Sequence, residues 1–190
     1  MSVKALHHLS HELYFCTFTC CNWLPLFEIT NTYSEVYNWL NIAQEKDYRT
    51  CAFVIMPNHL HFIMATPQNN ANLNKLISNG KRFIAYAIVE RLKQDSNHLI
   101  LSQLSNAVIA SDRKRGKLHQ VFKSSFDAKL ILNETMLLQK MQYIHHNPVS
   151  GKWNLASDFV LYPHSSAAYY ELGKPCLFPI THYAEILHGR

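Results

Sequence analysis

The chain has 190 residues, of which 48% are hydrophobic and only 5 are glycine and 7 proline. This length suits one domain, and the composition supplies a hydrophobic core and excludes a disordered chain. The formal net charge of +5, counted with 12 neutral histidines, is compatible with nucleic-acid binding but too modest to indicate it alone.

The sequence shows no membrane segment and no secretion signal. No apolar run approaches the roughly 20 residues that cross a bilayer, and residues 1–8 lack the apolar core of a signal peptide. The five cysteines form neither a disulfide framework nor a zinc-binding pattern. We therefore expect a cytoplasmic protein without membrane contact, whose cysteines are reduced thiols that mostly fill space in the core.

The first half of the chain predicts alternating strands and helices. Residues 13–21 are aromatic and β-branched, which indicates a strand, and residues 31–46 have apolar side chains at helical spacing. Two apolar runs, 50–56 and 60–65, flank a Pro-Asn turn signal and predict a pair of strands. Residues 72–94 carry the apolar stripe of a long helix.

The second half is less regular. Residues 99–110 are apolar and favour a helix, residues 112–117 form a charged loop, and residues 119–132 have the inward apolar positions of a strand. Residues 133–147 predict a helix with an asparagine cap and an acidic first turn, and the following proline ends it.

The order of these elements is strand, helix, strand, strand, helix, strand, helix. This order predicts an α+β fold, with a ferredoxin-like antiparallel sheet and helices packed against it. We assign residues 1–165 to this single domain and residues 166–190 to a C-terminal extension.

Two histidines on the second strand of the predicted pair are candidate metal ligands. His59 and His61 are two residues apart, so their side chains point to one face of a strand, while Leu60 points to the other. Two imidazoles about 6–7 Å apart at Cα can grip one divalent ion. A chance His-x-His pair is the alternative, because histidine is frequent in this chain.

A tyrosine and an amide lie on one face of the last predicted helix. Tyr143 and Asn147 are four residues apart, which places them one helical turn apart. A tyrosine hydroxyl has an ordinary pKa of about 10, so it becomes an effective nucleophile when a metal polarises the phosphate that it attacks. The alternative is a tyrosine that packs in the core.

The two segments together resemble a known family. Met56-Pro-Asn-His-Leu-His-Phe62 and Tyr143-Ile-His-His-Asn-Pro-Val149 are similar to motifs of the single-tyrosine HUH transposases. The likeness is greater to the repetitive-extragenic-palindrome-associated (REP-associated) tyrosine transposases, relatives of the insertion-sequence transposases. It extends over most of the chain, from the strand near Tyr14 to Tyr162-Pro-His-Ser-Ser-Ala167.

The resemblance implies a role for each motif residue. His59 and His61 would hold a divalent ion, Mg²⁺ or Mn²⁺, and Asn147 would be a third ligand, for which the two preceding histidines compete. Tyr143 would attack a DNA phosphate, forming a covalent 5′-phosphotyrosine intermediate and freeing a 3′-hydroxyl. The expected function is therefore cleavage and rejoining of single-stranded or hairpin DNA by a metal-dependent tyrosine endonuclease and strand transferase, that is, a transposase.

Basic residues are the candidate phosphate contacts. They gather in two short clusters and at one later position: Lys81, Arg82, Arg113, Lys114, Arg115, Lys117 and Lys123. Unpaired bases could stack on aromatic side chains of the last third of the chain, namely Trp153, Tyr162, Tyr169 and Tyr170. The family includes both monomers and homodimers, and the sequence does not decide between them.

Two other functions remain open at this stage. One is a catalytically idle regulator that binds DNA hairpins. The other is a small metal-dependent hydrolase, in which water is the nucleophile and Tyr143 is structural. A covalent protein–DNA adduct separates the transposase from both.

Overall fold

The structure is a computed structural model that describes residues 12–69 and 71–188. The expectation of no signal peptide falls on residues 1–8, outside the described residues, as do the last two residues of the predicted extension. Four strands form one sheet in the order β2-β3-β1-β4, and all neighbours are antiparallel. Their bounds are β1 (Leu13–Thr19), β2 (Arg49–Met56), β3 (His59–Ala65) and β4 (Asp127–Leu130).

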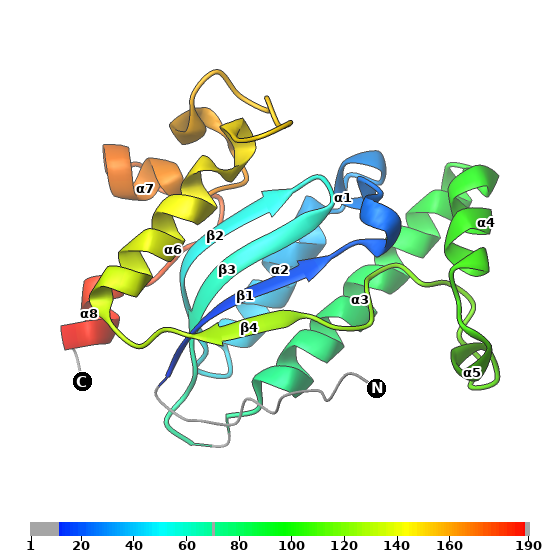
Figure 1. Ribbon diagram of the computed structural model, residues 1–190, viewed down its shortest axis with the longest axis horizontal. Coiled ribbons are helices and arrows are strands. Elements are labelled where there is room, and N and C mark those ends of the chain that lie inside the picture. The colour runs from blue at the N-terminus through cyan, green and yellow to red at the C-terminus, as the bar shows by residue number, and fades with distance from the viewer. Residues whose placement is uncertain (1–11, 70, 189–190) are drawn as a thin grey trace.

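Three long helices cover the two faces of this sheet (Figure 1). Helices α2 (Tyr33–Gln44) and α3 (Leu73–Gln94) pack on one face, and α6 (Glu134–His146) packs on the other. The remaining elements are short: η1 (Cys21–Trp23), α1 (Leu26–Ile29), α4 (His98–Asn106), α5 (Ala110–Arg113), η2 (Asn147–Val149), η3 (Phe159–Leu161), α7 (Ala167–Leu172) and α8 (Tyr183–His188). The α+β class and the antiparallel sheet expected from the sequence are confirmed.

The alternation of side chains along β3 decides what each face of the sheet carries. Leu60 and Phe62 point into the core beneath α2 and α3, while Ile63 belongs to the core on the α6 side. Because successive side chains alternate, His59 and His61 share the α6 side with Ile63. The strand therefore presents both histidines to the helix that carries Tyr143.

Short polar side chains fix where two of the long helices, α3 and α6, begin. The Asn72 side chain accepts a hydrogen bond from the Lys75 amide at 2.9 Å, and Asn133 accepts one from the Met136 amide at 2.9 Å. These bonds satisfy amides that the first turn of a helix leaves without partners. The helix α6 ends before Pro148, as its sequence predicts.

The predicted strand over residues 119–132 is wrong for its first part, since β4 covers only Asp127–Leu130. The preceding segment instead lies against α3, where the Lys81 ammonium donates to the backbone oxygens of Lys123 and Ser125 at 2.6 and 3.0 Å. The segment also contacts the end of β1 through an isolated antiparallel bridge of Cys20 to Phe122, with the Lys123 amide donating to the Thr19 carbonyl at 2.9 Å, but this pairing is too short to extend β4. The predicted charged loop, 112–117, also begins inside α5.

Residues 166–188 pack against the rest of the chain. The hydroxyl of Ser166 accepts a hydrogen bond from the Phe53 amide at 3.0 Å. Phe178 is buried in the core under α2 and α3, and Ile186 is buried on the α6 side. The predicted C-terminal extension thus contributes to both cores over its described part.

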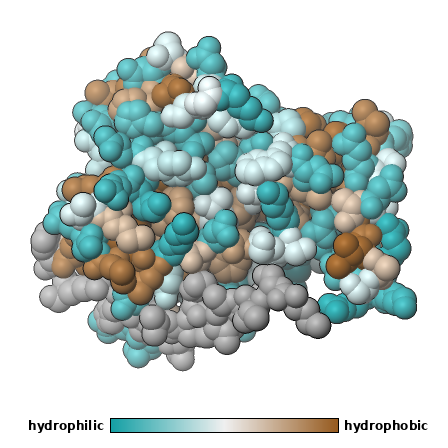
Figure 2. All heavy atoms as spheres, viewed as in Figure 1, coloured by the Kyte–Doolittle hydropathy of each residue, from teal (hydrophilic) through white to brown (hydrophobic). Residues whose placement is uncertain are grey.

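The described residues contain no helix that is long and apolar enough to span a membrane. Hydrophilic side chains cover much of the face in Figure 2, and apolar side chains gather over α4 and α5 at the right.

Four of the five cysteines are buried and all five are free thiols. Burial raises the pKa of Cys51 to about 12, which keeps this thiol protonated, as a space-filling role requires.

Candidate functional site

The histidine pair lies side by side on β3, with ring centroids 4.6 Å apart. Each residue exposes only 6% of its surface. Burial lowers the pKa of His59 to about 4, although a hydrogen bond to the Asn147 side chain acts in the opposite direction. Burial and the neighbouring His59 lower the pKa of His61 to about 3. Both rings are therefore neutral at pH 7, the form of histidine that binds metals.

The preceding residue, Asn58, fixes the proton on His59. Its amide nitrogen donates to the Trp23 carbonyl at 3.0 Å, so its oxygen faces Nδ1 of His59 at 2.6 Å. An amide oxygen only accepts hydrogen bonds, so Nδ1 carries the proton of the neutral ring. The Nε2 atom of His59 consequently carries the electron pair that a metal ligand needs, and the Asn147 side chain hydrogen-bonds the same ring.

His61 has a hydrogen-bond partner on one nitrogen and the tyrosine near the other. Its Nδ1 atom lies 2.6 Å from the Thr17 hydroxyl on β1, and its Nε2 atom lies 3.5 Å from the Tyr143 hydroxyl. The ring of Phe15 stacks on His61 at a centroid distance of 5.6 Å. When the Thr17 oxygen accepts from Nδ1, Nε2 of His61 is also free for a ligand bond.

Tyr143 reaches the histidines from α6 of the same chain. Its ring centroid lies 5.1 Å from that of His61 and 6.0 Å from that of Phe15. The residue is 52% exposed, so it is not the core tyrosine that the alternative interpretation required. A hydroxyl that faces both solvent and a histidine is accessible to a substrate.

Asn147 follows α6 at the first position of η2 and hydrogen-bonds the His59 side chain. The two histidines that compete with it point elsewhere. His145 lies 2.9 Å from the Ser166 hydroxyl through its Nε2 atom, and His146 stacks on Phe159 at 4.0 Å. Of these three residues, Asn147 is the one that contacts the histidine pair.

The donors fit a divalent ion only as a mixed set. Within residues 12–69 and 71–188, no three side chains of His, Cys, Asp or Glu are grouped closely enough to hold a metal. Two neutral imidazoles and the amide of Asn147 give three donors and leave coordination positions open. A site of this kind suits an ion that must also bind phosphate oxygens.

A cleft of about 460 Å³ opens beside Tyr143 and His61. Its rim includes Trp23 and Lys123, whose ammonium lies 4.1 Å from the centre of the Trp23 ring. Sequence reasoning missed Trp23, Asn58 and Thr17. Asn58 adjoins the histidine motif and could have been found, whereas no spacing in the sequence marks Trp23 or Thr17.

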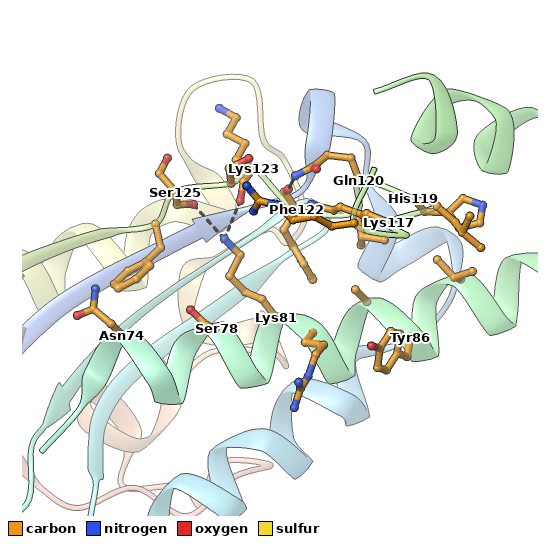
Figure 3. A pocket seen from close by; sticks show the side chains of 18 of the residues that line it. Asn74, Ser78, Lys81, Tyr86, Lys117, His119, Gln120, Phe122, Lys123 and Ser125 are labelled. Atoms are coloured by element: carbon orange, nitrogen blue, oxygen red, sulfur yellow. Dashed lines mark hydrogen bonds between the residues drawn. The ribbon is translucent and has the colours of Figure 1, made fainter. Parts of the chain in front are cut away.

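A larger groove of about 1240 Å³ lies between α3 and the segment that precedes β4 (Figure 3). The groove and the cleft share lining residues, including Lys123 and Lys129. Five predicted DNA contacts line the groove, namely Lys81, Arg82, Arg115, Lys117 and Lys123. Arg113 and Lys114 do not line it, and the guanidinium of Arg113 donates to the Ser105 carbonyl at 2.6 Å.

The predicted stacking residues mostly serve the protein interior. Tyr162 is buried and its hydroxyl donates to the Ile55 carbonyl at 2.8 Å. The hydroxyl of Tyr170 donates to the Cys51 carbonyl at 2.8 Å. Trp153 lies nearest the site of the four, with its ring centroid 6.5 Å from that of His59.

No protein-family model matches the chain, and no curated protein matches it. Solved structures do. The structure of a REP-associated tyrosine transposase bound to a REP hairpin is 17% identical, covers 94% of this chain and 89% of its own, and superposes with a TM-score of 0.59. A candidate transposase from Deinococcus radiodurans R1 is 18% identical over 76% of this chain and 94% of its own, with a TM-score of 0.35.

The first of these similarities identifies the architecture. The chain is an α+β protein with a four-stranded antiparallel sheet and packed helices, and its fold is that of a REP-associated tyrosine transposase. The resemblance inferred from the two motifs is confirmed at the level of the fold.

Proposed function

We propose that this chain is a transposase-type enzyme that cleaves and rejoins single-stranded or hairpin DNA through a covalent 5′-phosphotyrosine intermediate. The observation that carries the proposal is the position of the Tyr143 hydroxyl, 3.5 Å from Nε2 of His61 at the rim of an open cleft. A tyrosine that served only packing would not face a metal-binding donor set and solvent together.

His59, His61 and Asn147 would hold a divalent ion, Mg²⁺ or Mn²⁺. The bound ion would polarise the scissile phosphate and stabilise the negative charge of the transition state. The chain itself supplies a rigid pair of neutral imidazoles, because β3 is fixed between two strands and both Nδ1 atoms have partners.

Tyr143 performs the covalent step. Its hydroxyl loses its proton to water, and the oxygen attacks the phosphorus atom. The bond from phosphorus to the 3′ oxygen breaks, and that oxygen takes up a proton and leaves as a 3′-hydroxyl. One phosphodiester bond replaces another, so the reverse attack can rejoin the strand without ATP, in keeping with a sequence that has no P-loop motif.

The basic groove supports DNA as the substrate. Eight lysine and arginine residues line it against two carboxylates, Glu90 and Asp127. Such a surface follows a phosphate backbone without reading its sequence. Because the groove shares lining residues with the cleft at Tyr143, a strand held in it would continue to the nucleophile. The relative bound to a REP hairpin adds hairpin DNA as the form to test first.

The test is a covalent adduct. The protein is incubated with labelled oligonucleotides that contain hairpins and single-stranded flanks, with Mg²⁺ or Mn²⁺, and denaturing gels are scored for labelled protein. We expect an adduct with the wild type and none with Tyr143→Phe. The matched control is Tyr183→Phe, which alters a half-buried tyrosine on α8 that lines neither the cleft nor the groove, and should leave the adduct unchanged.

The outcomes separate the alternatives. An adduct that persists in Tyr143→Phe would refute Tyr143 as the nucleophile. Strand cleavage by the wild type without any adduct would favour the hydrolase, in which water attacks. Hairpin binding with neither cleavage nor adduct, whichever ion is supplied, would favour the idle regulator.

A further inference from the structure

The ring of Trp23 stands exposed at the rim of the cleft that contains Tyr143. We propose that Trp23 is a stacking platform for an unpaired nucleobase next to the phosphate that Tyr143 attacks. This inference rests on the proposed function for the identity of that phosphate. It adds a binding residue that contacts a base, a contact that neither the histidine motif nor the basic groove provides.

The position of the ring is the first support. Trp23 is 53% exposed, whereas the core tryptophan, Trp39, is 4% exposed. The Trp23 and His59 rings form a T-shaped contact, with centroids 6.0 Å apart and planes at 82°. It lines the same cleft as Tyr143 and His61. A base on this ring would therefore lie beside the metal-binding donors and the nucleophile.

The second support is the backbone conformation at Trp23, which directs the side chain toward solvent. Asn22 and Trp23 both have positive φ angles, 52° and 58°, a conformation that residues other than glycine rarely adopt. The bend is held by the Asn58 amide, which donates to the Trp23 carbonyl at 3.0 Å while its oxygen accepts from His59. One side chain thus fixes both the ring-bearing loop and a metal-binding histidine.

The third support is a positive charge that lies over the Trp23 ring. The Lys123 ammonium lies 4.1 Å from the ring centre, a cation–π contact. Lys123 also lines the basic groove, so it stands where the groove meets the cleft. An aromatic platform next to a cationic track is the combination that binds single-stranded nucleic acid, since every base has a face to stack and every phosphate a charge to neutralise.

The experiment measures binding and does not need cleavage. Short oligothymidylate is titrated into a Trp153→Phe protein, which retains Trp23 as its exposed tryptophan and Trp39 as its buried one, and the tryptophan emission is recorded. We expect quenching in this protein. The anisotropy of fluorescently labelled oligothymidylate, which needs no tryptophan, measures the affinity of every variant, and it should show an affinity about tenfold or more lower when Trp23→Ala is added. Trp23→Phe keeps an aromatic face and should restore most of the affinity.

Two controls isolate stacking from charge and from folding. An oligomer of abasic spacers with the same number of phosphates should bind wild type and Trp23→Ala equally, because it has no base to stack. Phe83→Ala removes another exposed aromatic ring, which also has a cation over it, the Arg82 guanidinium at 4.9 Å. Phe83 itself lines neither the cleft nor the groove. This variant should bind oligothymidylate as wild type does.

Equal affinity of wild type and Trp23→Ala for oligothymidylate, whether tight or undetectable, would overturn the inference. An adduct that forms normally in Trp23→Ala with equal binding would overturn it while the proposed function stands. The reverse failure is also distinct. If binding depends on Trp23 but the protein forms no adduct with any DNA, the stacking role of Trp23 is supported and the proposed transposase activity is refuted.

Discussion

Asn58 is a short, buried side chain that serves two neighbours at once. Its oxygen accepts from His59 and its nitrogen donates to the Trp23 carbonyl. Partners of this kind around metal-binding histidines set the tautomer and ring orientation, and their loss typically weakens metal affinity about 10- to 100-fold. The residue before the first histidine is therefore a positioning residue of the candidate site.

We expect Asn58→Leu to weaken Mn²⁺ binding by about tenfold or more, because Nδ1–H of His59 loses its acceptor and the ring is free to take the other tautomer. Asn58→Asp keeps an acceptor oxygen for Nδ1–H while losing the bond to the Trp23 carbonyl, and should retain more metal affinity than Asn58→Leu. Calorimetric titration with MnCl₂ measures the affinity, and ¹⁵N spectra of the His59 ring in the metal-free protein report the tautomer. Unchanged affinity with an unchanged tautomer in Asn58→Leu would contradict the role assigned to Asn58.

At the scale of elements, sequence reasoning succeeded where the determining contacts are local. The apolar periodicity of residues 31–46 and 72–94 predicted α2 and α3, and the cap Asn133 begins its helix as expected. It failed over residues 119–126, because this segment pairs with the end of β1 only through the isolated bridge of Cys20 to Phe122, and the Lys81 side chain, about forty positions earlier, binds the Lys123 and Ser125 carbonyls. A pattern along the chain carries no information on such a distant contact.

The packing of α2 on α3 depends on the absence of a side chain at Gly80. The ring of Trp39 in α2 lies against this point of α3, and a Cβ on Gly80 would come within 2.6 Å of Trp39 Cδ1 and closer to its Nε1. Trp39 cannot yield, since it is buried between Phe18 and Phe62. Glycine in a helix interior is therefore retained here for contact between helices.

We expect Gly80→Ala to destabilise the protein by about 1–2 kcal/mol, since overpacking outweighs the gain of about 1 kcal/mol in helix propensity. Chemical denaturation measures the free energy of unfolding. Ser78→Ala changes an exposed residue of the same helix and should leave stability unchanged or slightly higher. If Gly80→Ala proves as stable as Ser78→Ala, the close contact with Trp39 does not control the packing of α2 on α3.

The whole molecule shows how a modest net charge can still give a strongly basic groove. The formal charge is only +5, yet eight cations and two carboxylates line one groove. The grouping comes from α3 and the segment before β4, which are far apart in the sequence. Two short basic clusters could be identified in the sequence, but only the fold shows that Arg113 and Lys114 lie outside the groove.

The candidate site likewise contains some residues that the sequence identifies and others that only the fold reveals. His59, His61, Tyr143 and Asn147 could be named from two motifs, because strand and helix periodicity place each pair on one face and the resemblance of the motifs to a known family implies their roles. Thr17 and Trp23 could not be identified from the sequence, since each contacts the candidate site only through residues about forty positions away. Motifs therefore indicate the candidate reacting groups, and the fold shows which other side chains orient and surround them.

The charge of the groove yields a prediction on salt dependence. Each phosphate contact with a single strand contributes about −0.7 to the slope of log affinity against log salt concentration. Arg82 and Lys117 line the groove and lie outside the cleft at Tyr143. Replacing both with glutamine should therefore weaken binding of oligothymidylate and reduce the magnitude of the slope by about 1.4.

Fluorescence anisotropy at several NaCl concentrations measures this slope. Lys174→Gln removes a cation that lines neither cavity and should leave the slope unchanged. Lys81 is unsuited to the test, because its ammonium holds the backbone of the segment before β4, and its loss would alter the shape of the groove. A slope that is equal in wild type and the double variant would mean that the strand does not run along the groove between α3 and β4.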